Sequence, residues 1–370
     1  MKSIFLLTFM LFGLMSFGQV LTFTAQDSII QVDDAGELSN WFLDFDLKPD
    51  VFTTNSLGEK VTFISGENSM SFDVTKDLEV NFVILFNGDS AFTQLKYEMS
   101  RLDLLKSGSI YDYSQKENFN FSYQSASRSE LVVLRNKYKL DSIAGNGDEL
   151  SQVKKLMHWV HESIEHNGNK PNPKVKNASS LLEKCSKEDQ TLNCRGLAIV
   201  LNEVYLAMGF KSRYVTCMPK EAEFNDCHVI NTVFIESLNK WVWMDPTWDA
   251  YVMNEVGELL SIQEVRTYLI EGRRLKVNEH ANWNQITFID PDYYLNEYMA
   301  KNLYRLECPL SSVYDLESPK RGKLIEYIEL IPVDSYRQEP KMEKIKYKKT
   351  GVTNVTYKTN NPNLFWEIIE

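Results

Sequence analysis

The feature that most constrains the fold is a change from helix to strand periodicity in the middle of the chain. Apolar residues recur three or four positions apart between residues 197 and 208, on one face of a predicted helix. Asn193 is a good N-cap residue, and Gly209 stands where a helix C-terminal glycine belongs. From Lys211 onward the pattern predicts strands, over residues 211–217, 228–235 and 241–245. This region therefore combines one long helix with neighbouring strands.

The rest of the chain divides by its periodicity into further regions. With 370 residues, the chain has room for two or three domains. Alternating apolar and polar residues predict a β-rich accessory domain over 19–130, in which we find no candidate for chemistry. Helical spacing begins near residue 130, and the segment 131–290 is predicted as the functional core. The extension 291–370 has both helix and strand character and is expected to complete that core.

The N-terminus carries an export signal. Residues 1–18 combine Lys2, an apolar run and small residues before Gln19, which is the pattern of a cleavable signal peptide. No cysteine follows the run, so a lipid anchor is not expected there. No later segment is apolar enough to span a bilayer, so we expect no stable membrane insertion after cleavage. The sequence predicts a periplasmic or secreted protein.

The charge balance excludes one large class of partners. The net charge is −11, and nucleic-acid binding needs a positive field. The exception is Arg337–Lys349, which is rich in lysine. We interpret it as a half-exposed strand with lysines outward rather than as a binding patch.

Five cysteines are informative in an exported protein, because an odd number leaves at least one thiol unpaired within the chain. Their spacing contains no CxxC pair, so we predict neither a zinc site nor a cofactor. Cys217 and Cys227 flank a short loop and could form a disulfide, although buried free thiols are the favoured interpretation. The cysteines are Cys185, Cys194, Cys217, Cys227 and Cys308.

Three residues together suggest nucleophilic catalysis. Cys194 falls in the first turn of the predicted helix, where the helix N-terminus favours a thiolate. His228 begins one strand and Asp245 ends the next, as expected of a base and the carboxylate that orients it. Each residue alone has a commoner structural explanation, but their order and placement favour catalysis. A symmetric hairpin centred on Leu238 would put His228 opposite Trp248, so its pairing with Asp245 needs a shifted register or a bulge.

The motifs around these three residues resemble the transglutaminase-like superfamily, which has a papain-like cysteine fold. The resemblance covers about 130–285 and is carried by Asn193-Cys194-Arg195-Gly196, Asp226-Cys227-His228 and Trp243-Met244-Asp245-Pro246-Thr247. It implies an α+β core, in which the nucleophile helix packs on an antiparallel sheet. It also implies a triad of nucleophile Cys194, base His228 and orienting Asp245, which acts on amides through an acyl-thioester.

The resemblance leaves the reaction and some residues open. The backbone N–H of Cys194 would be one oxyanion donor, whereas Gln190 and Asn193 are only candidates for the second. We expect hydrolysis of peptide or protein substrates, including cell-wall peptide, rather than cross-linking, because water is abundant and no DxDxDG calcium motif occurs. The alternative is a non-catalytic module that binds peptide or cell-wall material.

Three histidines precede the nucleophile. The sequence predicts one helix that begins at Glu149 and carries His158, His161 and His166. His158 and His161 are three residues apart, a spacing at which two helical side chains can bind one metal ion. A solvated helix face is the favoured interpretation.

Overall fold

The computed structural model describes residues 20–224 and 226–367, and the expected signal peptide at 1–18 lies outside them. The chain divides into two compact units, with the division after Ser100. Within the described ranges no helix is long and apolar enough to cross a membrane.

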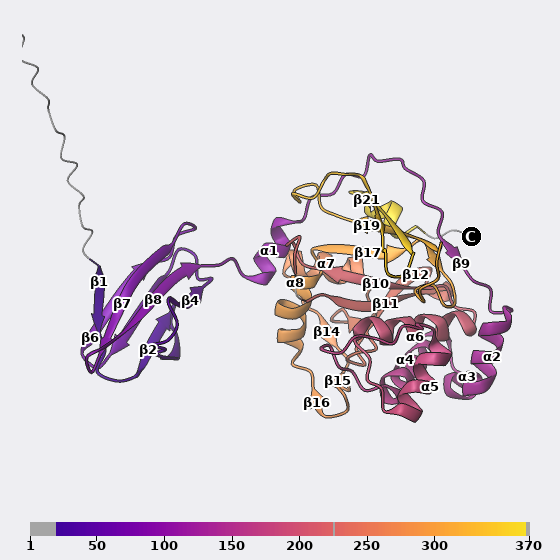
Figure 1. The fold of residues 1–370 in the computed structure, drawn as a ribbon, viewed down its shortest axis with the longest axis horizontal. Coiled ribbons are helices and arrows are strands. Elements are labelled where there is room, and N and C mark those ends of the chain that lie inside the picture. The colour runs from indigo at the N-terminus through magenta and orange to yellow at the C-terminus, as the bar shows by residue number, and fades with distance from the viewer. Residues whose placement is uncertain (1–19, 225, 368–370) are drawn as a thin grey trace, which may run out of the picture. The chain divides into compact units, whose positions relative to one another are not determined.

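The first unit is built from two four-stranded sheets, which confirms the predicted β-rich N-terminal region (Figure 1). One sheet has the order β1-β7-β8-β4 and the other β3-β2-β5-β6. Phe63 and Phe82 are buried between them, with ring centroids 5.1 Å apart. The strands are β1 Leu21–Thr24, β2 Ile29–Asp34, β3 Glu37–Phe42, β4 Asp50–Thr54, β5 Lys60–Ser65, β6 Asn68–Asp73, β7 Glu79–Phe86 and β8 Asp89–Tyr97.

The second unit is organised around a seven-stranded sheet of order β12-β11-β10-β17-β19-β21-β20. All neighbours are antiparallel except β19 and β21. Four of the seven strands come from beyond residue 290, so the C-terminal extension continues the sheet that holds the candidate site. The strands are β10 Ser212–Met218, β11 His228–Ile235, β12 Lys240–Met244, β17 Arg305–Pro309, β19 Leu324–Leu330, β20 Met342–Lys346 and β21 Thr353–Thr359.

Helix α6, Cys194–Ala207, packs on one face of this sheet against β10 and β11 (Figure 1). Every residue of α6 from Gly196 onward is buried, because α2, α4 and α5 cover it on the side away from the strands. The Asn193 side chain caps the helix, as predicted, by accepting from the Gly196 N–H. The surrounding helices are α2 Ser129–Tyr138, α3 Leu140–Ala144, α4 Glu149–Ser163 and α5 Ala178–Glu188.

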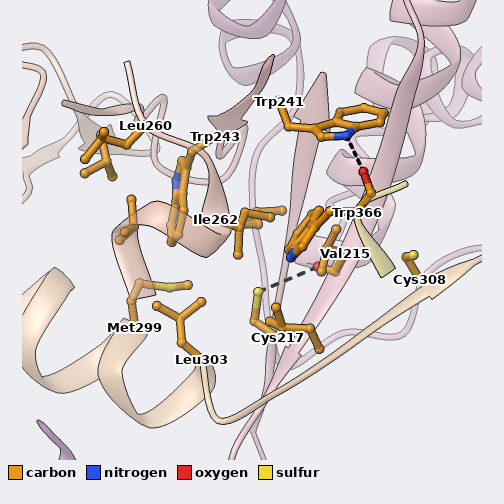
Figure 2. Close-up of a cluster of buried hydrophobic side chains, with 14 of the residues drawn as sticks. Val215, Cys217, Trp241, Trp243, Leu260, Ile262, Met299, Leu303, Cys308 and Trp366 are labelled. Atoms are coloured by element: carbon orange, nitrogen blue, oxygen red, sulfur yellow. Dashed lines mark hydrogen bonds between the residues drawn. The ribbon is translucent and has the colours of Figure 1, made fainter. Parts of the chain in front are cut away.

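A second apolar core covers the opposite face of the sheet. Figure 2 shows Val215, Cys217, Trp241 and Trp243 from the strands packed with residues of the following helices and the C-terminus. Strand alternation sends Val242 and Met244 to the α6 side and the two tryptophans to this side. With both faces covered, every residue of β10 and β11 is buried, the polar ones included.

Helices and short strands complete this second face. Helix α7, Ile262–Glu271, begins with a capping box of Ser261 and Glu264. A π-helix, Tyr293–Met299, continues into α8, Ala300–Asn302. The remaining elements are α1 Arg101–Ser107, β9 Ser122–Tyr123, β13 Val252–Met253, β14 Lys276–Val277, β15 Asn282–Trp283, β16 Thr287–Phe288, β18 Ser311–Ser312 and α9 Pro362–Phe365.

The segment 101–130 lies in the second unit, whereas the sequence placed the domain boundary at 130. Phe119 and Phe121 are buried in the core of that unit, and β9 pairs with β18. The alternation that predicted a strand over 119–123 therefore marks residues that pack on the second unit's core.

A buried ion pair joins the first turn of α6 to the C-terminal extension. The Arg195 guanidinium donates to both Glu317 oxygens at 2.6–3.0 Å, and Tyr214 OH donates to the same carboxylate at 2.8 Å. Burial alone would raise the pKa of Glu317, but the charge and hydrogen bonds of Arg195 outweigh burial and lower this pKa to about 2. The extension is thereby held against the residue that follows Cys194.

We expect Glu317→Gln to lower the free energy of unfolding by about 3 kcal/mol at neutral pH, because it leaves the Arg195 guanidinium, only 26% exposed, without its carboxylate partner. Since the folded pKa of Glu317 lies below the unfolded one, the wild type should lose this advantage as pH falls from about 4.5 to 2. Urea unfolding of both proteins across that range measures the difference.

The matched control is Glu188→Gln, which removes an exposed partner of Lys184 and should cost less than about 0.5 kcal/mol. Equal effects of the two substitutions, or an effect of Glu317→Gln that does not change with pH, would show that the Arg195–Glu317 ion pair does not stabilise the fold.

Candidate functional site

Cys194 is the first residue of α6, and a neighbouring loop fixes its position. Asn172 donates to Asn193 Oδ1 at 2.6 Å and accepts from the Asn193 N–H at 3.0 Å. Gly196 packs so closely on Asn172 that an added Cβ would lie 2.6 Å from its side-chain oxygen. The glycine of the Asn-Cys-Arg-Gly motif is thus required where loop and helix meet.

His228 and Asp245 lie side by side in the buried part of the site. His228 Nε2 is 2.7 Å from Asp245 Oδ2, and both side chains are almost fully buried. The β11–β12 register pairs Ile235 with Lys240, one residue away from a symmetric hairpin about Leu238. Continued, it would set His228 opposite Thr247, so Asp245 is a diagonal neighbour on the same face. The diagonal contact brings the two side chains together.

The backbone and a tyrosine hold the Asp245 carboxylate. Tyr294 OH donates to Oδ2 at 2.7 Å, and the Thr247 N–H donates to Oδ1 at 3.0 Å. The chain reverses here, since Asp245 and Ala250 exchange two backbone hydrogen bonds. Both carboxylate oxygens are therefore engaged, which fixes the carboxylate relative to His228.

Two of the three upstream histidines support the turn after Asp245. His158 donates from Nδ1 to Asp249 at 2.7 Å, and His161 donates from Nδ1 to the Pro246 carbonyl at 3.1 Å. His161 is buried, so the predicted solvated face is wrong for this residue. Within the described residues, no group of three or more His, Cys, Asp or Glu side chains is arranged to hold a metal ion.

The third histidine is a site residue that sequence reasoning missed. Helix α4 ends at Ser163, so His166 does not share the helix predicted for it. Its backbone instead bridges to Leu192, and its ring interacts with the Cys194 thiol. Trp283 Nε1 donates to His166 Nδ1 at 3.1 Å. Because Nδ1 accepts, a neutral His166 carries its proton on Nε2.

The electrostatics favour a charged pair of Cys194 and His228. Burial raises the pKa of the thiol, but His166, His228 and the Val229 N–H lower it to about 6. Burial lowers the pKa of His228, but the Asp245 carboxylate and Cys194 raise it to about 10. Between these values, thiolate and imidazolium are the favoured states. The other ring nitrogen, His228 Nδ1, is buried and has no hydrogen-bond partner among the described residues.

Aromatic residues of the π-helix wall the site. The Tyr298 ring meets the His228 ring edge-on at 5.2 Å, and Trp248 packs against both Tyr294 and Tyr298. Tyr294 is buried, and it also holds Asp245. Trp241 and Trp243 of β12 lie in the apolar core of Figure 2.

The other predicted candidates are placed as follows. All five cysteines lie in the described ranges and are free thiols, so Cys217 and Cys227 do not form a disulfide in this structure. Gln190 donates to the neighbouring Thr191 carbonyl at 2.6 Å. The oxygen of Asn193 is occupied by its capping role.

Residues 137–246 match the model of the transglutaminase-like superfamily. This match confirms the resemblance for the segment that contains Cys194, His228 and Asp245, and identifies it as a transglutaminase-like core. No curated protein sequence matches the chain.

Three solved structures are similar to parts of the chain. They are a candidate cysteine protease from Cytophaga hutchinsonii (16% identity, TM-score 0.25, 39% of this chain and 42% of that one), a candidate protease from Parabacteroides distasonis (11%, 0.23, 47% and 32%) and red sea bream transglutaminase (10%, 0.21, 59% and 45%). The matched region spans less than half the length of each of these chains.

We expect iodoacetamide to alkylate Cys194 with a rate that rises through about pH 6, because the thiolate is the reactive form. His228→Ala should move this midpoint above pH 8, since burial remains and the nearby positive charge is lost. Mass spectrometry of the digested protein locates and quantifies the adduct.

Cys185 is the internal control, because burial raises its pKa to about 11 and its labelling should stay slow at neutral pH. A Cys194 midpoint near 8.5 that does not respond to His228→Ala would contradict the charged pair.

Proposed function

We propose that this chain is an exported cysteine hydrolase that cleaves peptide or protein amides through an acyl-thioester on Cys194. One observation carries the proposal: His228 Nε2 lies 2.7 Å from the buried Asp245 carboxylate, and this imidazole lowers the pKa of the Cys194 thiol at the N-terminus of α6. Nucleophile, base and orienting carboxylate are the parts that acyl transfer requires.

The proposed first step uses the charged pair. The Cys194 thiolate attacks the amide carbonyl carbon, and His228 gives a proton from Nδ1 to the departing amine as the C–N bond breaks. Water then attacks the thioester carbonyl while His228 accepts a proton from it. The C–S bond breaks, the acid leaves, and the Cys194 thiolate and His228 imidazolium are restored. Asp245 keeps Nε2 protonated throughout, so Nδ1 is the nitrogen that exchanges protons with the reacting groups.

Two N–H groups are suited to the negative oxygen of the tetrahedral intermediate. The backbone N–H of Cys194 opens α6 and has no acceptor within the helix. We assign the second donor to His166 Nε2–H, because Trp283 occupies Nδ1 and the ring lies against the Cys194 thiol. This assignment favours His166 over Gln190, whose Nε2 donates to the Thr191 carbonyl, and over Asn193, whose side chain is held at the helix cap through its oxygen.

Hydrolysis is proposed over cross-linking because water is the more abundant acyl acceptor. We expect casein incubated with the protein to yield new amino termini, no incorporation of dansylcadaverine, and no product with Cys194→Ala. Incorporated amine without hydrolysis would make the protein an acyltransferase. No product of either kind, together with an unactivated Cys194 thiol, would favour the peptide-binding alternative.

We expect His166→Phe to lower kcat by about a hundredfold, the usual effect of losing one oxyanion donor. It should also raise the pKa of Cys194, because the ring stabilises the thiolate. Trp283→Phe is the matched control: it removes only the hydrogen bond that fixes the tautomer, and its effect should be smaller. Equal activity of His166→Phe and wild type would contradict the assignment.

A further inference from the structure

A groove opens beside the first turn of α6, next to the candidate nucleophile. Its volume is about 410 Å³. The loop that carries Asn172 and Lys174 forms one side, Arg195 contributes from the helix, and the C-terminal extension forms the other side with Tyr327 and Asn354. Arg195 directly follows Cys194 in α6 and Asn172 binds Asn193, so the groove opens at the same turn of the helix that carries the thiol.

The lining of this groove is positive, although the whole chain is acidic. Lys174, Lys176 and Arg195 line it, against a single carboxylate, Glu317. That carboxylate is occupied by Arg195, Tyr214 and Lys176. Lys174 is exposed and forms no ion pair with any acidic side chain in the described ranges. The groove therefore presents positive charge without an internal partner for Lys174.

Further positive charge lies at the rim, and one polar atom inside has no partner. Tyr347 lines the groove, and its neighbours Lys346 and Lys348 are exposed at the end of the edge strand β20. Asn354 Oδ1 is buried and makes no hydrogen bond with the described residues. The exposed lysines therefore add to the positive field that a carboxylate in the groove would meet.

We propose that the groove lined by Lys174 and Arg195 binds an acidic side chain of the substrate, within a few residues of the amide that Cys194 attacks. The proposal rests on the proposed function and adds to it a substrate class: polypeptides with Asp or Glu beside the cleaved bond. The carboxylate pairs with Lys174, and the apolar walls contact the methylenes of the acidic side chain.

Peptide chloromethyl ketones and iodoacetyl peptides test the groove without a known substrate, because the thiolate displaces chloride or iodide and forms a stable C–S bond. The chloromethyl ketones carry the peptide on the side of the acyl group that Cys194 would retain. The iodoacetyl peptides carry it on the side of the departing amine. In each, Glu or Gln occupies one of the three positions nearest the reactive group. The rate constant of Cys194 alkylation is measured for each pair at low and high salt.

In the wild type we expect the Glu reagent to react about fivefold faster than its Gln partner in at least one position, and less so at high salt. Lys174→Glu should abolish or invert this ratio. Lys155→Glu, which makes the same charge change at an exposed helical lysine that does not line the groove, should preserve it.

Equal rates for Glu and Gln reagents in every position of both series would overturn the groove proposal, as would a ratio unchanged in Lys174→Glu. Either result leaves the proposed function standing, provided that Cys194 still reacts faster than Cys185. If Cys194 reacts no faster than Cys185 with any reagent, the proposed function itself fails.

Discussion

The buried contact between His228 and Asp245 is the interaction on which the site depends. Burial alone would make His228 neutral, and a neutral imidazole would leave the Cys194 thiol protonated at neutral pH. The carboxylate reverses this balance, because its charge outweighs the cost of burying the imidazolium. Tyr294 and the Thr247 N–H in turn hold the Asp245 carboxylate in place beside the imidazole.

The structure around this contact comes from distant parts of the chain. Tyr294 belongs to the π-helix near residue 295, and His158 and His161 reach the turn after Asp245 from α4. The Arg195–Glu317 ion pair connects α6 to the C-terminal extension, whose strands continue the same sheet. The extension thus contributes to the fold, to the wall of the site and to the groove beside Cys194.

Part of this arrangement could be predicted from the sequence. The periodicity after Asn193 predicted α6 and its cap, because helix spacing and capping are local properties. The sequence also predicted that His228 and Asp245 lie together, although their diagonal contact depends on a one-residue register that composition does not reveal. The sequence pattern placed His166 on the preceding helix. In the structure that helix ends at Ser163, and the His166 backbone pairs instead with Leu192, a contact that the local pattern does not reveal. The partners of Asp245 depend on tertiary contacts and carry no local signal.

Nitrogen NMR of the His228 imidazole across pH would test the central claim most directly, which is that His228 is a cation beside a thiolate in the resting protein. The account requires both ring nitrogens of the wild type to stay protonated from neutral pH to about 10. In Asp245→Asn the ring should lose a proton at a much lower pH. A wild-type ring that titrates near its ordinary value of about 6.5, unchanged in Asp245→Asn, would contradict the account.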